Sequence, residues 1–118
     1  MDQKRIDEIR DQALHVVPKA LEIAKSREPR LAAATLGYAA VSDLQPDAMI
    51  EIVIKIDNEA DLKIRLSADR NGNCVPVFPE FIGSFRSIFD DGIDHALAAV
   101  IVRALDRPMA LRQSRPPG

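Results

Sequence analysis

Residues 49–68 read MIEIVIKIDNEADLKIRLSA, and this stretch decides the fold. In residues 50–56 an aliphatic residue stands at every second position, and the same period of two returns in residues 62–68. Such alternation is typical of strands with one buried and one wet face. The sequence therefore predicts an antiparallel hairpin whose strands run from Met49 to Ile56 and from Ala60 to Ala68.

Charge predicts the register of this hairpin, because unlike charges on facing strands stabilise a pair and like charges destabilise it. A slip of two residues would oppose Lys55 and Lys63. The expected register instead opposes unlike charges, with Ile54 facing Leu62, Lys55 facing Asp61 and Glu51 facing Arg65. It leaves a three-residue loop, 57–59, in which Asn58 is expected to take the turn geometry.

A third strand is expected after the hairpin. Asn71-Gly72 is the preferred pair for a type I′ turn, which would return the chain as a strand from Cys74 to Phe78. Because Pro76 has no amide hydrogen, that strand is expected at an edge of the sheet.

Helices are predicted on both sides of these strands. Between Ile6 and Ala24 apolar residues recur every three or four positions, with Asp2 as a possible cap and Pro18 as a break or kink. Residues 29–41 open on a proline and are apolar nearly all round, which indicates a second helix, either at the centre of the fold or in a dimer contact. Residues 79–89 predict a third helix that ends at residues 90–92.

The last predicted helix runs from Ile93 to Leu105, although its β-branched centre leaves a strand as the alternative. The predicted fold is thus α+β, a three-stranded antiparallel meander packed against helices in the order α-α-β-β-β-α-α. Residues 1–106 form one domain in this interpretation, and residues 107–118 form a mobile, basic, proline-containing tail.

Composition narrows the functional classes. The chain has 118 residues, a net charge of −2 and one cysteine, which is Cys74, so it has no internal disulfide. It begins without the apolar run of a secretion signal, and a cytoplasmic location is the expectation. The small net charge gives no general attraction to nucleic acid or lipid, so nucleic acid is an unlikely partner and no membrane association is expected.

Two groups of residues are candidate sites. Asp91, Asp94 and His95 carry ligand atoms within five residues, which is compatible with a divalent metal, although acids in a first helical turn more often serve as caps. Aromatic residues and the edge strand form a candidate partner interface made of Phe81, Phe85, Phe89, Val75 and Val77. The phenylalanines step by four along one predicted helix, so core packing is the competing interpretation.

No catalytic set or phosphate-binding loop is evident, and no cofactor is expected. The first hypothesis is therefore a non-catalytic protein-protein interaction module, a regulator, adaptor, chaperone or inhibitor, expected to be a homodimer. The second is a small metal-dependent enzyme or ligand-binding protein that uses Asp91, Asp94 and His95. The third is nucleic-acid binding through the arginines after residue 102, of which there are four against one acid.

Overall fold

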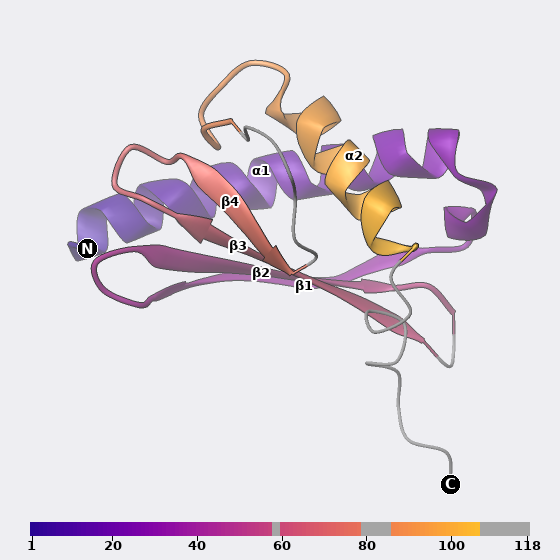
Figure 1. Ribbon diagram of the computed structural model, residues 1–118, viewed down its shortest axis with the longest axis horizontal. Helices are drawn as coiled ribbons and strands as arrows, with labels where there is room; N and C mark the ends of the chain where they lie inside the picture. The colour runs from indigo at the N-terminus through magenta and orange to yellow at the C-terminus, as the bar shows by residue number, and fades with distance from the viewer. Residues whose placement is uncertain (58–59, 79–85, 107–118) are drawn as a thin grey trace, which may run out of the picture.

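The computed structural model describes residues 1–57, 60–78 and 86–106. Its elements are α1 (Gln3–Arg27), the short 3-10 helix η1 (Pro29–Leu31), β1 (Thr35–Asp43), β2 (Ala48–Lys55), β3 (Asp61–Ala68), β4 (Cys74–Phe78) and α2 (Ile93–Ala104). The strands form one antiparallel sheet in the order β1-β2-β3-β4, and both helices lie over the same face of it (Figure 1). The α+β class is confirmed, whereas the three-stranded sheet and the order α-α-β-β-β-α-α are wrong in detail.

The hairpin of β2 and β3 has the register that the charges predict. Ile54 lies opposite Leu62, Lys55 opposite Asp61 and Glu51 opposite Arg65. The backbone N–H of Ile56 donates to the carbonyl of Ala60 at 3.0 Å, which closes the loop between the strands. Asn58, the expected turn residue, lies outside the described residues.

The helix predicted for residues 29–41 is wrong. Only Pro29–Leu31 turn, as η1, and the chain then runs as β1 along β2. Alanine favours helices, but pairing with a neighbouring strand outweighs local propensity. A bulge between Leu36 and Tyr38 also hides the period of two that marks a strand. Gly37 lies in this bulge, where an added Cβ would come within 3.0 Å of the Val53 carbonyl oxygen.

At Pro18 the sequence predicts either a break or a kink, and the break is wrong, because α1 is one continuous helix of 25 residues with Pro18 inside it. Pro18 lies on the exposed side of α1, where water can reach the Leu14 carbonyl that loses its helical partner. The predicted cap is present, since Asp2 Oδ1 accepts from the backbone N–H of Arg5 at 2.8 Å. No helix in the described part of the chain is long and apolar enough to cross a membrane.

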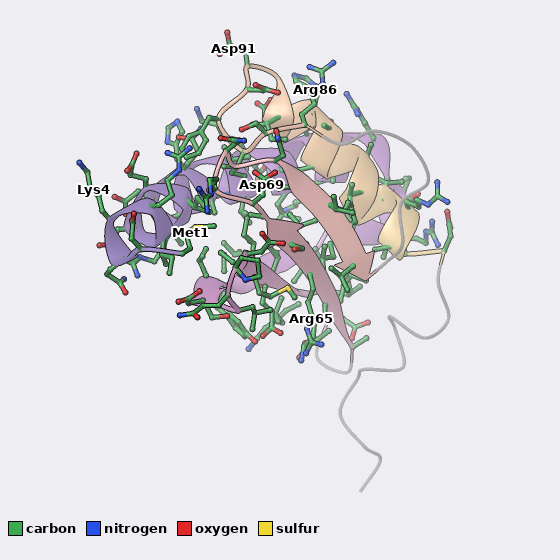
Figure 2. All side chains as sticks on the ribbon, turned by 60° about the vertical axis from the view of Figure 1, so that its left-hand side comes forward. Met1, Lys4, Arg65, Asp69, Arg86 and Asp91 are labelled. Atoms are coloured by element: carbon green, nitrogen blue, oxygen red, sulfur yellow. The ribbon has the colours of Figure 1, made fainter. Side chains whose placement is uncertain are left out.

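The connection from β3 to β4 differs from the predicted type I′ turn. Asp69, labelled in Figure 2, accepts from the backbone N–H groups of Asn71 and Asn73 through Oδ1, at 2.8 and 3.0 Å. Gly72 has a φ of 83°, but Asn71 is not in the positive-φ region. A type I′ turn needs positive φ at both central residues, so the Asp69 carboxylate organises this loop instead.

The helix predicted for residues 79–89 falls largely outside the described residues, and the prediction is wrong for residues 86–89. There the backbone N–H of Cys74 donates to the carbonyl of Arg86 at 3.2 Å, and that of Ile88 donates to the carbonyl of Gly72 at 2.8 Å. These bonds hold the segment along the start of β4. The last predicted helix is confirmed as α2.

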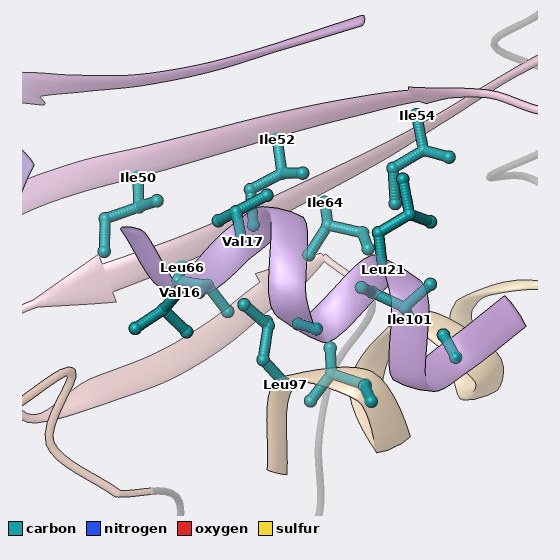
Figure 3. Close-up of a cluster of buried hydrophobic side chains, with 14 of the residues drawn as sticks. Val16, Val17, Leu21, Ile50, Ile52, Ile54, Ile64, Leu66, Leu97 and Ile101 are labelled. Atoms are coloured by element: carbon teal, nitrogen blue, oxygen red, sulfur yellow. The ribbon is translucent and has the colours of Figure 1, made fainter. Parts of the chain in front are cut away.

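The core lies between the helices and one face of the sheet. Val16, Val17 and Leu21 of α1 and Leu97 and Ile101 of α2 meet the aliphatic side chains of β2 and β3 (Figure 3). The residues of β2 and β3 that face the helices are at most 1% exposed: Ala48, Ile50, Ile52, Ile54, Leu62, Ile64, Leu66 and Ala68. Burial of one such isoleucine or leucine contributes about 1.5–3 kcal/mol. The alternation in the hairpin therefore turns its other residues to the side without helices.

Candidate functional site: the outer face of the sheet

The side of the sheet away from α1 and α2 is covered by no helix of the described residues (Figure 1). We call it the outer face. Strand pairing and burial place on it Tyr38, Ala40, Ser42, Met49, Glu51, Val53, Lys55, Asp61, Lys63, Arg65, Ser67, Val75 and Val77. Of these residues only Val53 is buried. The outer face is thus a broad surface to which all four strands contribute.

A hydrogen-bonded group of three side chains crosses the centre of the outer face. The Tyr38 hydroxyl on β1 donates to Glu51 Oε1 on β2, and Arg65 Nε on β3 donates to Glu51 Oε2 at 2.9 Å. One carboxylate therefore links three adjacent strands. Figure 2 shows Arg65 on the side of the sheet away from the helices.

The electrostatics of this group follow from its contacts. The hydrogen bond from Tyr38 lowers the pKa of Glu51 below its ordinary value, and Arg65 adds to this effect. The same hydrogen bond raises the pKa of Tyr38, because ionised tyrosine would lie beside a carboxylate. Near neutral pH the group holds an ionised carboxylate, a guanidinium and a neutral phenol. The pKa values of Glu51 and Tyr38 both shift away from neutral pH, so neither side chain is suited to proton transfer there.

Apolar side chains flank the group. Val75 and Val77 on β4 are 59% and 46% exposed, and Tyr38 on β1 is 45% exposed. The structure thus places both predicted interface valines on the outer face. Tyr38 was missed from sequence, because residues 29–41 were assigned to a helix and tyrosine at that position carried no strand signal.

The predicted interface phenylalanines are not shown to join this surface. Phe81 and Phe85 lie outside the described residues. Phe89 is 38% exposed and packs at the N-terminal end of α1, with the Arg5 guanidinium carbon 4.6 Å from the ring centroid. It therefore lies on the helix side of the sheet, apart from Val75 and Val77.

The predicted metal ligands lie at the start of α2. The Arg27 guanidinium is 3.2 Å from His95 Nδ1, and Asp94 Oδ1 accepts from the backbone N–H of His95 at 2.9 Å. The side chain of Asp91 is exposed (Figure 2). Over residues 1–57, 60–78 and 86–106, no three histidine, cysteine, aspartate or glutamate side chains gather closely enough to hold a metal ion. The metal site stays a prediction.

A separate cleft of about 600 Å³ lies between the start of α1 and the turns at one end of the sheet. Its walls are Met1, Asp2, Arg5, Gln45, Pro46 and Arg70. Arg5 is already engaged, because its Nε donates to the Arg70 carbonyl at 2.6 Å and it stacks on Phe89. These walls contain no histidine, cysteine or serine that could act as a nucleophile or proton carrier.

Cys74, the single cysteine of the chain, is another candidate nucleophile. Its side chain is 1% exposed and points into the core, and burial raises its pKa to about 12. The thiolate is the reactive form, so burial and the raised pKa disfavour Cys74 as a nucleophile at neutral pH.

Searches against models of protein families, curated proteins and solved structures found no match to this chain. The described part of the chain is an α+β fold with helices on one face of an antiparallel sheet and no described element over the other face.

Proposed function

We propose that this protein is a non-catalytic protein-protein interaction module, which works as a homodimer and binds another protein through the outer face. The observation that supports this proposal is the open face itself. It combines exposed apolar side chains at both sides, Tyr38 on β1 and Val75 and Val77 on β4, with a fixed charged group between them. Exposed apolar residues that are rimmed or interrupted by polar groups are typical of protein-binding surfaces.

The chemistry of the face suits a protein partner. Tyrosine and arginine are enriched at interfaces, because each offers a large contact area together with a polar tip that can be satisfied. Tyr38 and Arg65 are both held in place by Glu51, so a partner would meet side chains that need little further ordering. The paired charges would orient the partner more than they would increase its affinity.

The experiment is a comparison of captured proteins. The chain is immobilised as wild type, as Val75→Asp/Val77→Asp and as Leu44→Asp, and each is exposed to an extract of the native host. Leu44 lies in the turn between β1 and β2 and is 56% exposed, so Leu44→Asp matches the change in polarity at a site away from β4. Any captured protein is then purified and titrated against the three chains.

The proposal predicts a protein that binds wild type and Leu44→Asp with equal affinity and binds the double variant at least ten times more weakly. A protein that binds all three chains equally would place the interface elsewhere. No saturable binding to wild type would contradict the proposed function.

A further inference from the structure

The two edges of the sheet differ in how they are protected. At one edge, β4 has only five residues, contains Pro76 and pairs with β3 through a bulge. At the other edge, β1 has nine residues, no proline and a single charged residue, Asp43, at its end. Natural sheets shield their edges with short strands, proline, bulges or charges, so β4 is shielded and most of β1 is not.

The free edge of β1 carries unpaired backbone. β1 bonds to β2 on one side, and no backbone hydrogen bond within residues 1–57, 60–78 and 86–106 joins its other side to another segment. Its bulge lies near the start, so residues 38–43 are a regular stretch of six that can accept a further strand.

Apolar surface lies on the helix side of the same edge. Leu36, Ala39 and Val41 of β1 point toward the helices but are only partly buried, whereas the β2 residues that they face are 0% exposed. Leu14 of α1 is 48% exposed. Edge position explains both facts, because no strand or helix of the described residues lies beyond β1 to cover them.

Helix geometry puts Leu14 on the β1 side of α1. Arg5 and Arg27 reach Phe89 and His95, so their flank of α1 is the one turned toward α2. Leu14 follows Arg5 by nine residues, which is about two and a half turns, and therefore lies on the opposite flank. That flank is turned away from α2, toward the free edge of the sheet.

We propose that two copies of this chain pair antiparallel along β1 and form one continuous eight-stranded sheet. The proposal rests on the homodimer of the proposed function and names its interface. The two-fold axis passes near Ala39, so that Ala39 faces Ala39 of the second copy and Tyr38 faces Ala40. Residues 41–43 of each copy then lie beside residues 35–37 of the other, where the bulge interrupts the regular spacing. The contact uses the same patch on both copies, as two-fold symmetry requires.

The helices agree with this symmetry. The main-chain nitrogen of Met1 lies 3.4 Å from Asp43 Oδ1, so α1 starts beside the end of β1 and runs back along it. Leu14 is near the middle of α1, as Ala39 is near the middle of β1. The axis that pairs the strands therefore brings the two Leu14 side chains toward each other above the sheet.

Charge also favours this arrangement. Asp7 and Lys25 are on the same flank of α1 as Leu14, because they precede and follow it by seven and eleven residues, about two and three turns. Within one copy Asp7 pairs with Arg10, and Lys25 pairs with Glu22. Antiparallel helices bring the Asp7 end of one copy toward the Lys25 end of the other, so that Asp7 and Lys25 approach as unlike charges. The two Asp43 side chains fall at opposite ends of the paired strands, so they do not repel each other.

The estimated contact lies at the lower end of the size range of stable dimer interfaces. Nine residues of strand are about 30 Å long, and one sheet layer with the helix layer above it is about 20 Å high, so each copy offers a patch of roughly 600 Å² before side-chain corrugation is counted. Stable interfaces bury about 800 Å² of accessible surface per partner. The pairing would also join two outer faces into one surface with both Tyr38 side chains near its centre.

The first test is sedimentation equilibrium of wild type, Ala40→Lys and Val77→Lys. Ala40→Lys places two lysines beside the axis, whereas Val77→Lys adds the same charge to the same face at the far edge. We expect twice the chain mass of 13.0 kDa for wild type and Val77→Lys, and at least a tenfold weaker association for Ala40→Lys. Circular dichroism checks that each variant is folded.

The second test crosslinks the proposed contact and does not depend on a substitution that weakens it. Ala39→Cys should form a disulfide between copies, because two Cα atoms that face each other across antiparallel strands are within bonding range. Val77→Cys is the control, and buried Cys74 can stay in both chains.

A monomeric wild type, or crosslinking of Val77→Cys in place of Ala39→Cys, would overturn the proposal. If Ala40→Lys is monomeric but still binds a captured protein, the dimer contact stands as proposed and partner binding does not require it. If all chains are monomeric and still bind that protein, only the dimer is wrong.

Discussion

Glu51 and Arg65 face each other across β2 and β3, and Arg65 Nε donates to Glu51 Oε2 at 2.9 Å. Tyr38 donates to the other oxygen of the same carboxylate. The pair was expected from charge alone, whereas its link to a further strand was not. Through this link a charge pair that sets the register of a hairpin also orders the centre of the outer face.

The coupling between Glu51 and Arg65 should be small and sensitive to salt. Arg65 is 46% exposed and Glu51 25% exposed in their side chains, so solvent screens the pair. A double-mutant cycle with Glu51→Gln and Arg65→Met, measured by urea unfolding, should give about 0.5 kcal/mol at pH 7. The coupling should fall toward zero in 1 M salt, and a value that persists there would show that the interaction is not ionic.

The same group predicts a dependence of stability on pH. The pKa of Glu51 in the folded chain is lowered, first by the Tyr38 hydrogen bond and also by Arg65, from an ordinary value of 4.5. Its stabilising contribution is therefore fully present above pH 4.5 and is lost as the pH falls through the lowered pKa. The difference in unfolding free energy between wild type and Glu51→Gln should shrink below pH 4.5. A constant difference from pH 7 to pH 3 would contradict this role.

Gly72 and Gly92 form a matched pair of glycines with positive φ, at 83° and 78°. An added Cβ at Gly72 would lie 2.5 Å from Phe89 Cδ2, whereas at Gly92 the nearest atom within reach is Arg86 NH1 at 3.6 Å. Gly92→Ala should cost about 1 kcal/mol for its backbone conformation alone. Gly72→Ala should cost more, because Phe89 must also move. Equal losses in urea unfolding would mean that Phe89 does not pack on this turn.

Ile52 tests the division of the sheet into two faces. It is 0% exposed at the centre of β2, so Ile52→Ala should lower the unfolding free energy by about 2–5 kcal/mol. Val77→Ala on the outer face should change it by about 0.5 kcal/mol or less. Similar losses at both positions would indicate that the outer face is buried in the free chain.

Cys74 should be protected from thiol reagents. Its pKa of about 12 leaves almost no thiolate at pH 8, and its side chain is 1% exposed. Labelling by iodoacetamide should be at least a hundredfold slower in the native chain than in urea. Because the folded pKa is the raised one, the stability that Cys74 contributes is fully present below its unfolded pKa of about 8.5 and is lost as the pH rises toward 12. Fast labelling of the native chain would contradict the inward position of Cys74.

The parts of the fold that depend on local sequence signals could be predicted from the sequence. The hairpin register followed from Lys55, Glu51 and their partners, the position of β4 from Pro76, and α2 from its apolar period. The helix predicted for residues 29–41 is wrong, because an alanine-rich strand resembles a helix in sequence and the bulge at Gly37 breaks the alternation of β1. That segment is a strand because it pairs with the edge of β2. This pairing is a tertiary contact, which the local sequence pattern does not show.

The candidate site was predictable only in part. The sequence predicts Val75 and Val77 as interface residues on an exposed edge strand, and the structure places both side chains on the outer face. Tyr38 was missed together with its strand. The open face itself depends on which side of the sheet the helices cover, and the sequence does not encode that choice in any short motif.

The measurement that tests the central proposal most directly is side-chain footprinting of the chain, alone and bound to a protein captured from its host. Hydroxyl-radical labelling reports the exposure of Tyr38, Val75 and Val77 on the outer face and of Phe89 on the helix side. We predict that binding lowers the labelling of the three outer-face residues at least threefold and leaves Phe89 unchanged. Protection of Phe89 with no change at Tyr38, Val75 and Val77 would contradict the outer face as the binding surface.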